Sequence, residues 1–91
     1  MSDGKQLQPL YTKELGASGP TMVFLHGVGG TSRYWESRVA PLAEHCQLLL
    51  VDLLGFGRSP KPWRPRYTVE LHVAELHRAL RGRARVSLVG H

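Results

Sequence analysis

The segment Thr21–Ser32, TMVFLHGVGGTS, decides the fold of this 91-residue chain. Its four consecutive apolar residues, Met22 to Leu25, are typical of a short strand that is buried on both faces. A glycine-rich turn, HGVGG at residues 26–30, follows the strand, and Thr31 or Ser32 can begin a helix. Because such a turn brings backbone N–H groups close to a bound group, residues 26–30 form either a phosphate cradle or an oxyanion hole.

The net charge of +5 is distributed unevenly along the chain. Residues 1–44 hold four basic and four acidic residues, whereas residues 45–91 hold eight basic and three acidic residues and carry the whole excess. The basic residues of the second half form two clusters: Arg58, Lys61, Arg64 and Arg66, then Arg78, Arg81, Arg83 and Arg85. The two clusters form either a nucleic-acid-binding surface or two solvated surfaces, one on a loop and one at a helix end. Basic side chains are stabilising at the C-terminal end of a helix because of the helix dipole. Because no helix-turn-helix or aromatic RNA-binding motif accompanies them, we expect solvated surfaces and no nucleic-acid partner.

Neither a membrane segment nor a secretory signal is visible in the sequence. The longest apolar runs, Met22–Leu25 and Leu48–Val51, are far shorter than the roughly 20 residues that span a bilayer. The N-terminal stretch MSDGKQLQPL lacks the apolar region of a signal peptide, so we expect a cytoplasmic protein without a membrane partner. The single Cys46 excludes an internal disulfide, and its place beside a strand-like run predicts a buried apolar role.

Strand-like and helix-like segments alternate along the chain. The β-prone residues 10–15 and the apolar runs 22–25, 48–51 and 86–90 are predicted strands. A helix over about residues 32–45, interrupted at Pro41, is predicted by the spacing of Trp35, Val39, Leu42 and Ala43. A second helix is expected between its cap Thr68 and Gly82, with an apolar stripe of Val69, Val73, Leu76 and Leu80.

This alternation is typical of an α/β protein. We expect a parallel sheet whose strands alternate with helices, with helices on both faces in three α/β/α layers. Ligands of such sheets bind beyond the carboxyl ends of the strands. The segments expected at those ends are residues 26–30, Asp52–Ser59 and Gly90-His91, so these three segments form the candidate site.

The glycine turns do not match the common phosphate-binding motifs. A dinucleotide fingerprint needs G-x-G-x-x-G, but Ser32 and Pro60 occupy the third glycine position of the two candidates. A P-loop needs Gly-Lys followed by Ser or Thr, which the sequence does not contain. A helical zinc site also fails, because His72 and His77 are five positions apart and do not share a helix face. We therefore expect no cofactor and no metal, with both histidines at the surface.

Three motifs in sequence order resemble those of the α/β-hydrolase family, which includes epoxide hydrolases, haloalkane dehalogenases, haloperoxidases and esterases. FLHGVGG at residues 24–30 resembles the family's H-G-x-x-G oxyanion turn. DLLGFGRSP at residues 52–60 resembles its D-x-x-G-x-G-x-S turn. VSLVGH at residues 86–91 resembles the strand that enters the nucleophile elbow, G-H-S-x-G. The resemblance covers roughly residues 4–91 and makes residues 1–91 a partial α/β-hydrolase domain that ends at the nucleophile elbow.

The resemblance implies a role for each residue of the three turns. The backbone N–H of Val28 would donate to the developing oxyanion, and Gly27 and Gly29 would let the turn approach the substrate. His26 would support the turn rather than transfer protons. The structural turn would consist of Asp52, Gly55, Gly57 and Ser59, with the carboxylate accepting loop N–H groups. Gly90 and His91 would belong to the elbow, with His91 directly before the nucleophile.

The nucleophile, acid and base of a catalytic triad are not identified among the 91 residues, since no serine stands in a G-x-S-x-G elbow. The chain alone is therefore expected to be inactive, and the parent protein to hydrolyse an ester-type or related bond in a small molecule. A serine nucleophile would imply acyl substrates, and an aspartate would imply epoxides or haloalkanes. One alternative is a non-catalytic hydrolase-fold remnant that binds a ligand or a protein. A basic nucleic-acid-binding fragment is a third hypothesis.

The resemblance also predicts the order of the strands. In the family, the strand at residues 22–25 lies between those at residues 48–51 and 86–90. Val86–Gly90 would then be an open apolar edge, which invites self-association. We expect the isolated chain to be poorly soluble or partly molten.

Overall fold

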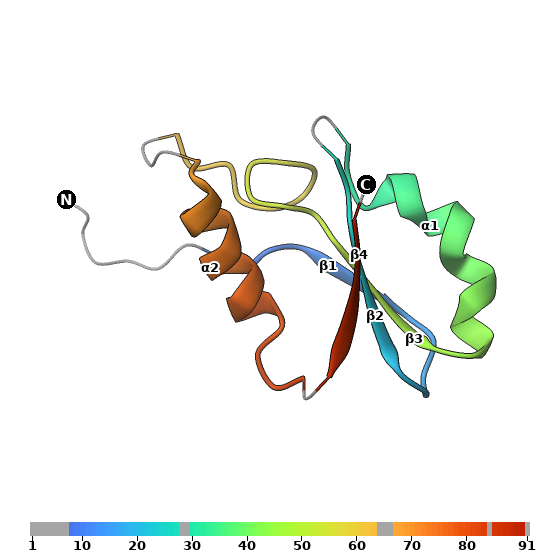
Figure 1. Ribbon diagram of the computed structural model, residues 1–91. Helices are drawn as coiled ribbons and strands as arrows, with labels where there is room; N and C mark the ends of the chain where they lie inside the picture. Colours follow the sequence, from blue (N-terminus) through green and yellow to red (C-terminus); the bar gives the residue numbers. More distant parts are fainter. Residues whose placement is uncertain (1–7, 28–29, 64–66, 84, 91) are drawn as a thin grey trace.

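The computed structural model describes residues 8–27, 30–63, 67–83 and 85–90. The elements in chain order are β1 (Thr12–Leu15), β2 (Thr21–Leu25), α1 (Arg33–Val39), the 3₁₀ helix η1 (Ala40–Glu44), β3 (Gln47–Val51), α2 (Val69–Ala79) and β4 (Val86–Gly90). The four strands form a sheet in the order β1-β3-β2-β4. Figure 1 shows α1 and α2 on opposite sides of this sheet, so the predicted three-layer arrangement is confirmed.

The sheet is mixed, whereas the sequence analysis predicted parallel strands. β2, β3 and β4 are parallel, but β1 runs antiparallel to β3, with Thr12 opposite Val51. A parallel connection needs a crossover of about a dozen residues or more, which the short loop at residues 16–20 cannot provide. The loop turns back past the start of β3, so closely that a Cβ on Gly16 would lie 2.3 Å from the carbonyl oxygen of Cys46. This tight reversal forces β1 into the antiparallel direction.

Each face of the sheet carries its own hydrophobic cluster, because successive residues of a buried strand point to opposite faces. The cluster on the α2 face includes Val23, Leu49, Val51, Leu71 and Leu76. The cluster on the α1 face includes Phe24, Leu48, Leu50, Trp35 and Val39. Full burial of one such side chain contributes about 1.5–3 kcal/mol. The apolar strands β2 and β3 therefore anchor both helical layers and hold the turns at their carboxyl ends.

α1 ends at Val39 and is followed by η1, a break that the sequence predicted at Pro41. Proline lies in the first turn of η1, where its missing N–H removes no helical hydrogen bond. Thr31 caps the start of α1, since its hydroxyl accepts the N–H of Arg33 at 3.2 Å. The side chain of Ser32 makes no cap hydrogen bond.

α2 begins at its predicted cap, but two positions of its predicted apolar stripe are wrong. The hydroxyl of Thr68 accepts the N–H of Leu71 at 3.1 Å. Val69 is 73% exposed and Val73 is 59% exposed. The helix is turned about its axis so that Leu71, rather than the two valines, packs on the sheet together with Leu76.

An ion pair between a buried carboxylate and a half-buried guanidinium accompanies this orientation of α2. Glu75 is buried on the packed side of the helix, and its carboxylate accepts from the guanidinium of Arg78 at 2.8 Å. A carboxylate in such a place needs a charged partner, because an unpaired buried charge is costly. The apolar pattern alone could not predict that a glutamate, rather than Val73, faces inward.

β4 lies at the edge of the sheet in the described part of the chain, as the strand order predicted. It pairs in parallel with β2, from Val86 opposite Thr21 to Gly90 opposite Leu25. The carboxyl ends of β2 and β4 are thus neighbours, which brings Gly90 beside the turn that begins at His26.

Candidate active site

His26 joins the turn after β2 to the turn after β3. Its imidazole is buried, with Nδ1 2.8 Å from the carbonyl oxygen of Gly27 and Nε2 2.9 Å from the backbone nitrogen of Leu53. Because the N–H of Leu53 donates to Nε2, that nitrogen carries no proton, and Nδ1–H donates to Gly27. Both ring nitrogens are therefore engaged in hydrogen bonds to backbone groups. The histidine therefore acts as a structural link between two loops, and the edge of its ring contacts Phe56 with 5.2 Å between ring centroids.

Asp52 is a second link between the same two turns. Its carboxylate is 2% exposed and accepts the N–H of Ser32 at 2.5 Å and the N–H of Arg58 at 3.0 Å. Hydrogen bonds to a charged group contribute about 1.5–3 kcal/mol each, and they offset the cost of burying the charge. Asp52 thereby fixes where α1 starts relative to the loop after β3.

Two glycines let that loop close around its neighbours. Gly57 has φ +55°, and a Cβ there would lie 2.3 Å from Oδ2 of Asp52. Gly55 has φ +89°, and a Cβ there would lie 2.9 Å from Cε1 of Tyr67. Positive φ values favour glycine, and in both places the space for a side chain is already occupied. These two positions require glycine for reasons of backbone conformation and of contact.

Ser59 ties the end of the loop to the chain before β1. Its buried hydroxyl donates to the carbonyl oxygen of Asp52 and accepts the N–H of Tyr11 at 2.8 Å. The loop is closed by a further backbone hydrogen bond, from the N–H of Gly55 to the carbonyl of Pro60 at 2.8 Å. The turn residues 52–60 thus hold one another through backbone and side-chain hydrogen bonds.

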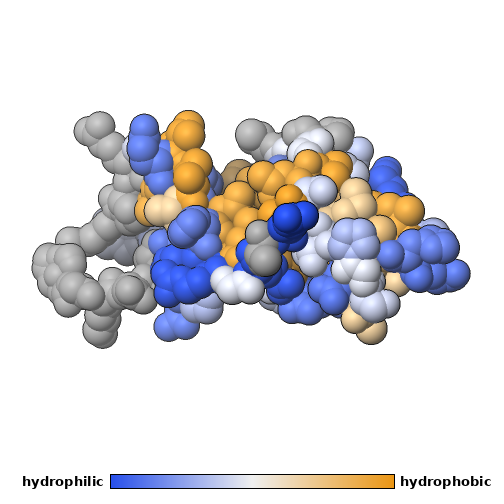
Figure 2. All heavy atoms as spheres, turned by 60° about the horizontal axis from the view of Figure 1, so that its bottom comes forward, coloured by the Kyte–Doolittle hydropathy of each residue, from blue (hydrophilic) through white to orange (hydrophobic). Residues whose placement is uncertain are grey.

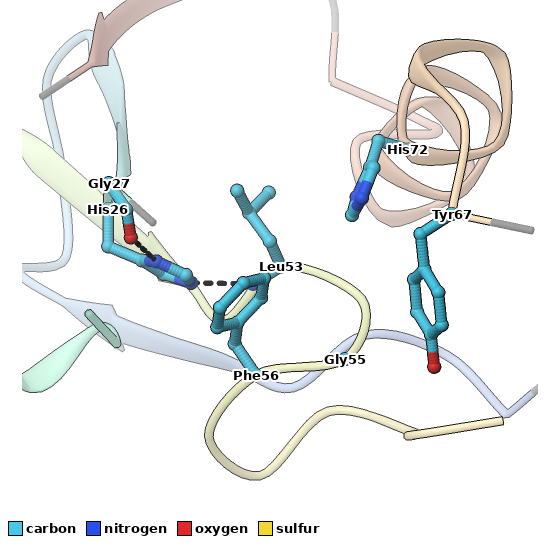
Figure 3. A pocket seen from close by; sticks show the side chains of 7 residues that line it. All are labelled: His26, Gly27, Leu53, Gly55, Phe56, Tyr67 and His72. Carbon is cyan, nitrogen blue, oxygen red and sulfur yellow. Dashed lines mark hydrogen bonds between the residues drawn. The ribbon is translucent and has the colours of Figure 1, made fainter. Parts of the chain in front are cut away.

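A cavity of about 630 Å³ opens beside these turns, at the carboxyl ends of β2 and β3. It is lined by His26, Gly27, Leu53, Gly55, Phe56, Tyr67 and His72. Figure 3 shows His26, Leu53 and Phe56 on one side of the cavity, with Tyr67 and His72 facing them from the start of α2. Its size is within the range of small-molecule sites, and its position is the one at which α/β sheets bind ligands.

The sequence analysis missed Tyr67 and His72 as lining residues. His72 is half-buried and faces the cavity, so its prediction as a surface residue was wrong, whereas His77 is exposed. The cause is again the orientation of α2, which places position 72 on the same side as Leu76 and Glu75. Nδ1 of His72 is buried and has no hydrogen-bond partner among the described residues. A correct assignment of the inner helix face would have placed this histidine beside the candidate site.

Three of the predicted site residues, Val28, Gly29 and His91, lie outside the described residues. Gly30 closes the turn after β2, since its N–H donates to the carbonyl of Gly27 at 3.0 Å. The residues that the structure describes include no group of three or more His, Cys, Asp or Glu side chains that could hold a metal ion. Within the same ranges, no helix has the length and apolar character needed to cross a membrane.

Comparison with known proteins identifies the class to which this fold and site belong. The model of the α/β-hydrolase fold family matches residues 20–91, and the chain therefore belongs to that family. A similar curated protein is RutD of Escherichia coli O44:H18, named as a carbamate hydrolase with the activity marked as provisional. The two are 35% identical over 77 residues, which are 82% of this chain and 28% of RutD.

Solved structures of hydrolases share the fold. A marine microorganism esterase superposes with a TM-score of 0.85 at 28% identity, over 94% of this chain and 33% of the esterase. E-2-(acetamidomethylene)succinate hydrolase superposes with a TM-score of 0.76 at 35% identity, over 90% of this chain and 31% of that protein. The chain spans less than a third of the length of RutD and of this second hydrolase.

Proposed function

We propose that this chain is the N-terminal part of an α/β-fold hydrolase and that residues 26–30 supply its oxyanion turn. The observation that carries the proposal is the pair of hydrogen bonds by which His26 fixes the turn, to Gly27 and to Leu53, at the rim of the cavity. An oxyanion hole needs donors that are already oriented before the reaction. A buried imidazole with a hydrogen bond at each ring nitrogen restrains the backbone that carries such donors. The hydrolase names of several relatives are consistent with this chemistry.

The proposed reaction is ester-type or related hydrolysis of a small molecule. A nucleophile outside this chain attacks the substrate carbonyl, and negative charge develops on the carbonyl oxygen. The backbone N–H of Val28 donates a hydrogen bond to this oxygen. Collapse of the tetrahedral intermediate expels the leaving group, and water then cleaves the covalent intermediate. Gly27 and Gly29 allow the turn to approach the substrate. The roles of Val28 and Gly29 rest on the sequence motif.

The remaining residues of the site position this turn. Asp52, Gly55, Gly57 and Ser59 hold the neighbouring loop, and through the Asp52–Ser32 hydrogen bond they hold the start of α1. Gly90 and His91 would lead into the nucleophile elbow beside the oxyanion turn, since Gly90 lies opposite Leu25. On the sequence grounds given above, we propose a cytoplasmic enzyme that needs no cofactor and whose partner is its substrate, not nucleic acid or a membrane.

The first test is to read the coding sequence after the codon for His91. Ser-x-Gly would indicate a serine hydrolase with acyl substrates, and Asp-x-Gly would indicate epoxide or haloalkane chemistry. A stop codon would refute the proposed catalytic role. We call the polypeptide that contains this chain and the residues so revealed the complete domain.

The second test addresses the oxyanion donor in the complete domain. Val28→Pro removes the backbone N–H, and its matched control Val28→Ala keeps it. With an activated ester such as 4-nitrophenyl acetate, we expect kcat to fall by about 10²–10³ for Val28→Pro. Val28→Ala should stay within about threefold of the parent, because its donor is intact. Equal activity of the two variants would refute the role of this N–H.

A non-catalytic binding module is the second candidate, and the cavity favours it. Its volume of about 630 Å³ and its mixed apolar and imidazole lining suit a small apolar ligand with a polar group, whether or not a nucleophile is present. A coding sequence without a nucleophile, together with saturable ligand binding by the purified protein, would favour this candidate over hydrolysis.

A further inference from the structure

A second pocket lies beside the loop at residues 52–60, apart from the cavity of the candidate active site. Its volume is about 520 Å³, and among the described residues it shares no lining residue with that cavity. The lining residues come from the chain at the starts of β1 and α1 and from the loop after β3, so they all lie between residues 11 and 58. The pocket is therefore built without β4.

Basic groups outnumber acidic groups in this pocket. Its basic lining residues are Lys13, Arg33 and Arg58, and its acidic ones are Glu36 and Asp52. Glu36 forms an ion pair with Lys13 at 2.5 Å, and the buried carboxylate of Asp52 accepts two backbone N–H groups. Neither arginine forms an ion pair with another described residue. The two guanidinium groups are thus the charges that remain for a ligand.

Contacts with Tyr11 and Asp52 hold Arg58 in place. The guanidinium carbon lies 5.3 Å from the centroid of the Tyr11 ring, which is a cation–π distance, and Nη1 donates to the Tyr11 hydroxyl at 3.3 Å. The backbone N–H of Arg58 donates to Asp52 at 3.0 Å. Because a guanidinium has five N–H donors, these contacts leave donors for a ligand, and the Tyr11 hydroxyl keeps its own hydrogen for donation.

Arg33 occupies a position that the helix itself does not favour for a cation. It is the first residue of α1, and its side chain is exposed. The helix dipole favours acidic residues at this end and basic residues at the other. The hydroxyl of Thr31, which accepts the N–H of Arg33 at 3.2 Å, also lines the pocket and can donate its hydrogen. Binding of an anion accounts for a basic residue at this place.

We propose that this pocket binds the phosphate group of a small organic molecule between the guanidinium groups of Arg33 and Arg58. Arginine suits this task because its planar fork of donors binds two phosphate oxygens at once. The hydroxyls of Tyr11 and Thr31 supply further donors. The pocket volume is within the range of small-molecule sites, so the ligand is an organic phosphate rather than free phosphate. This binding does not depend on the proposed hydrolysis.

Isothermal titration calorimetry of the complete domain tests the ligand class. The probes are phenyl phosphate, inorganic phosphate and acetate, compared at equal ionic strength. Phenyl phosphate should bind at least about threefold more tightly than inorganic phosphate, because its ring fills part of the pocket. Acetate should bind at least about fivefold more weakly than inorganic phosphate, because it has a single charge and fewer oxygens. Equal binding of the two phosphates would assign the pocket to free phosphate.

Absence of saturable binding by either phosphate would overturn the inference, and so would acetate that binds as tightly as inorganic phosphate.

Charge-removing variants test the place of binding. Arg33→Gln and Arg58→Gln should each raise the Kd of phenyl phosphate at least about fivefold, because each removes a charge-assisted donor. Arg81→Gln is the matched control, since Arg81 is exposed in the connection from α2 to β4 and does not line the pocket. Its effect should stay below about twofold. Equal effects of the three variants would overturn the inference, because they would reflect only the overall charge.

The control lies at another surface of the molecule. Figure 2 views the molecule from the side on which β4 begins and shows hydrophobic surface next to strongly hydrophilic side chains there. A basic residue on that side reports general attraction of anions, without the contacts that hold Arg58 in the pocket.

Urea unfolding of the complete domain provides a second test. Phosphate salts stabilise many proteins through exclusion from their surface, so the parent is compared with the double variant Arg33→Gln/Arg58→Gln. Both side chains are exposed, so the double variant should fold like the parent. A ligand that binds the folded state adds stability of its own. Phenyl phosphate at about ten times its Kd should therefore raise the urea midpoint of the parent at least about twice as much as that of the double variant. An equal rise would overturn the inference.

Discussion

The backbone N–H of Leu53 donates to Nε2 of His26 across 2.9 Å, and this contact joins the turns that follow two neighbouring strands. The other ring nitrogen holds Gly27, so one buried side chain controls the relative position of both turns at the rim of the cavity. A loop segment normally tolerates change, but this histidine ties Gly27, after β2, and Leu53, after β3, into one unit. The stability of that unit can be measured separately from catalysis.

His26→Ala should destabilise the complete domain by about 2–4 kcal/mol, because it leaves the Leu53 N–H and the Gly27 carbonyl without their partner. Urea unfolding monitored by circular dichroism measures this change. His77→Ala serves as the control, since His77 is exposed on α2, and its effect should stay within about 0.5 kcal/mol. Equal stability of the two variants would contradict the structural role assigned to His26.

Gly57→Ala should destabilise the complete domain by at least about 2 kcal/mol more than Gly82→Ala. Both glycines have positive φ, +55° and +88°, so both variants carry the conformational cost of about 1–2 kcal/mol. A Cβ at Gly57 also displaces the Asp52 carboxylate, whose hydrogen bonds contribute about 1.5–3 kcal/mol each. A Cβ at Gly82 meets no described heavy atom within 4 Å.

The two glycine variants are compared by their urea midpoints and slopes. Equal midpoints would mean that the loop moves away from the added methyl group at no cost, and the close packing of Gly57 against Asp52 would then be irrelevant to stability. A change in slope would instead report a change in the surface exposed on unfolding.

The strands and the break at Pro41 could be predicted because short-range chemistry determines them, whereas the strand order was predicted from the family resemblance. The runs Met22–Leu25 and Leu48–Val51 are apolar at every position, as is typical of a strand covered on both faces. Proline interrupts a helix wherever it occurs in the interior. The turns could be recognised from their glycine, aspartate and serine residues in the motif order.

The direction of β1 and the orientation of α2 depend on contacts between distant residues, so the local pattern did not predict them. The loop at residues 16–20 is too short for a parallel crossover, and its close approach to the backbone of Cys46 at Gly16 is a contact that no pattern in residues 10–15 shows. In α2, the Glu75–Arg78 ion pair allows a glutamate to face inward, and Val73 is exposed as a result. Because the predicted stripe assigned the wrong inner face to α2, the sequence analysis also failed to identify His72 as a residue of the site.

The isolated 91-residue chain should not hydrolyse 4-nitrophenyl acetate faster than its unfolded form in urea at equal concentration, after correction for the effect of urea on the spontaneous reaction. The reason is that no triad is identified within its sequence, so the oxyanion turn has no nucleophile to assist. The unfolded control matters, because five histidines can accelerate this reaction weakly without any site. Saturable turnover that disappears on unfolding would contradict the prediction and would reveal a nucleophile within the chain.

His72→Leu should leave the complete domain as stable as the parent or stabilise it by up to about 1 kcal/mol. Nδ1 of His72 is buried and makes no hydrogen bond to the described residues, and an unsatisfied buried polar atom costs about 1–3 kcal/mol. Leucine fills similar space without that cost and favours a helix slightly more than histidine does.

If Nδ1 of His72 instead binds a polar group of the substrate, the same variant should raise KM at least fivefold while kcat changes less than twofold. His77→Leu, on the exposed side of α2, should change neither quantity. Loss of stability by more than about 1 kcal/mol would show that His72 has a partner in the complete domain, and an unchanged KM would exclude it from substrate binding.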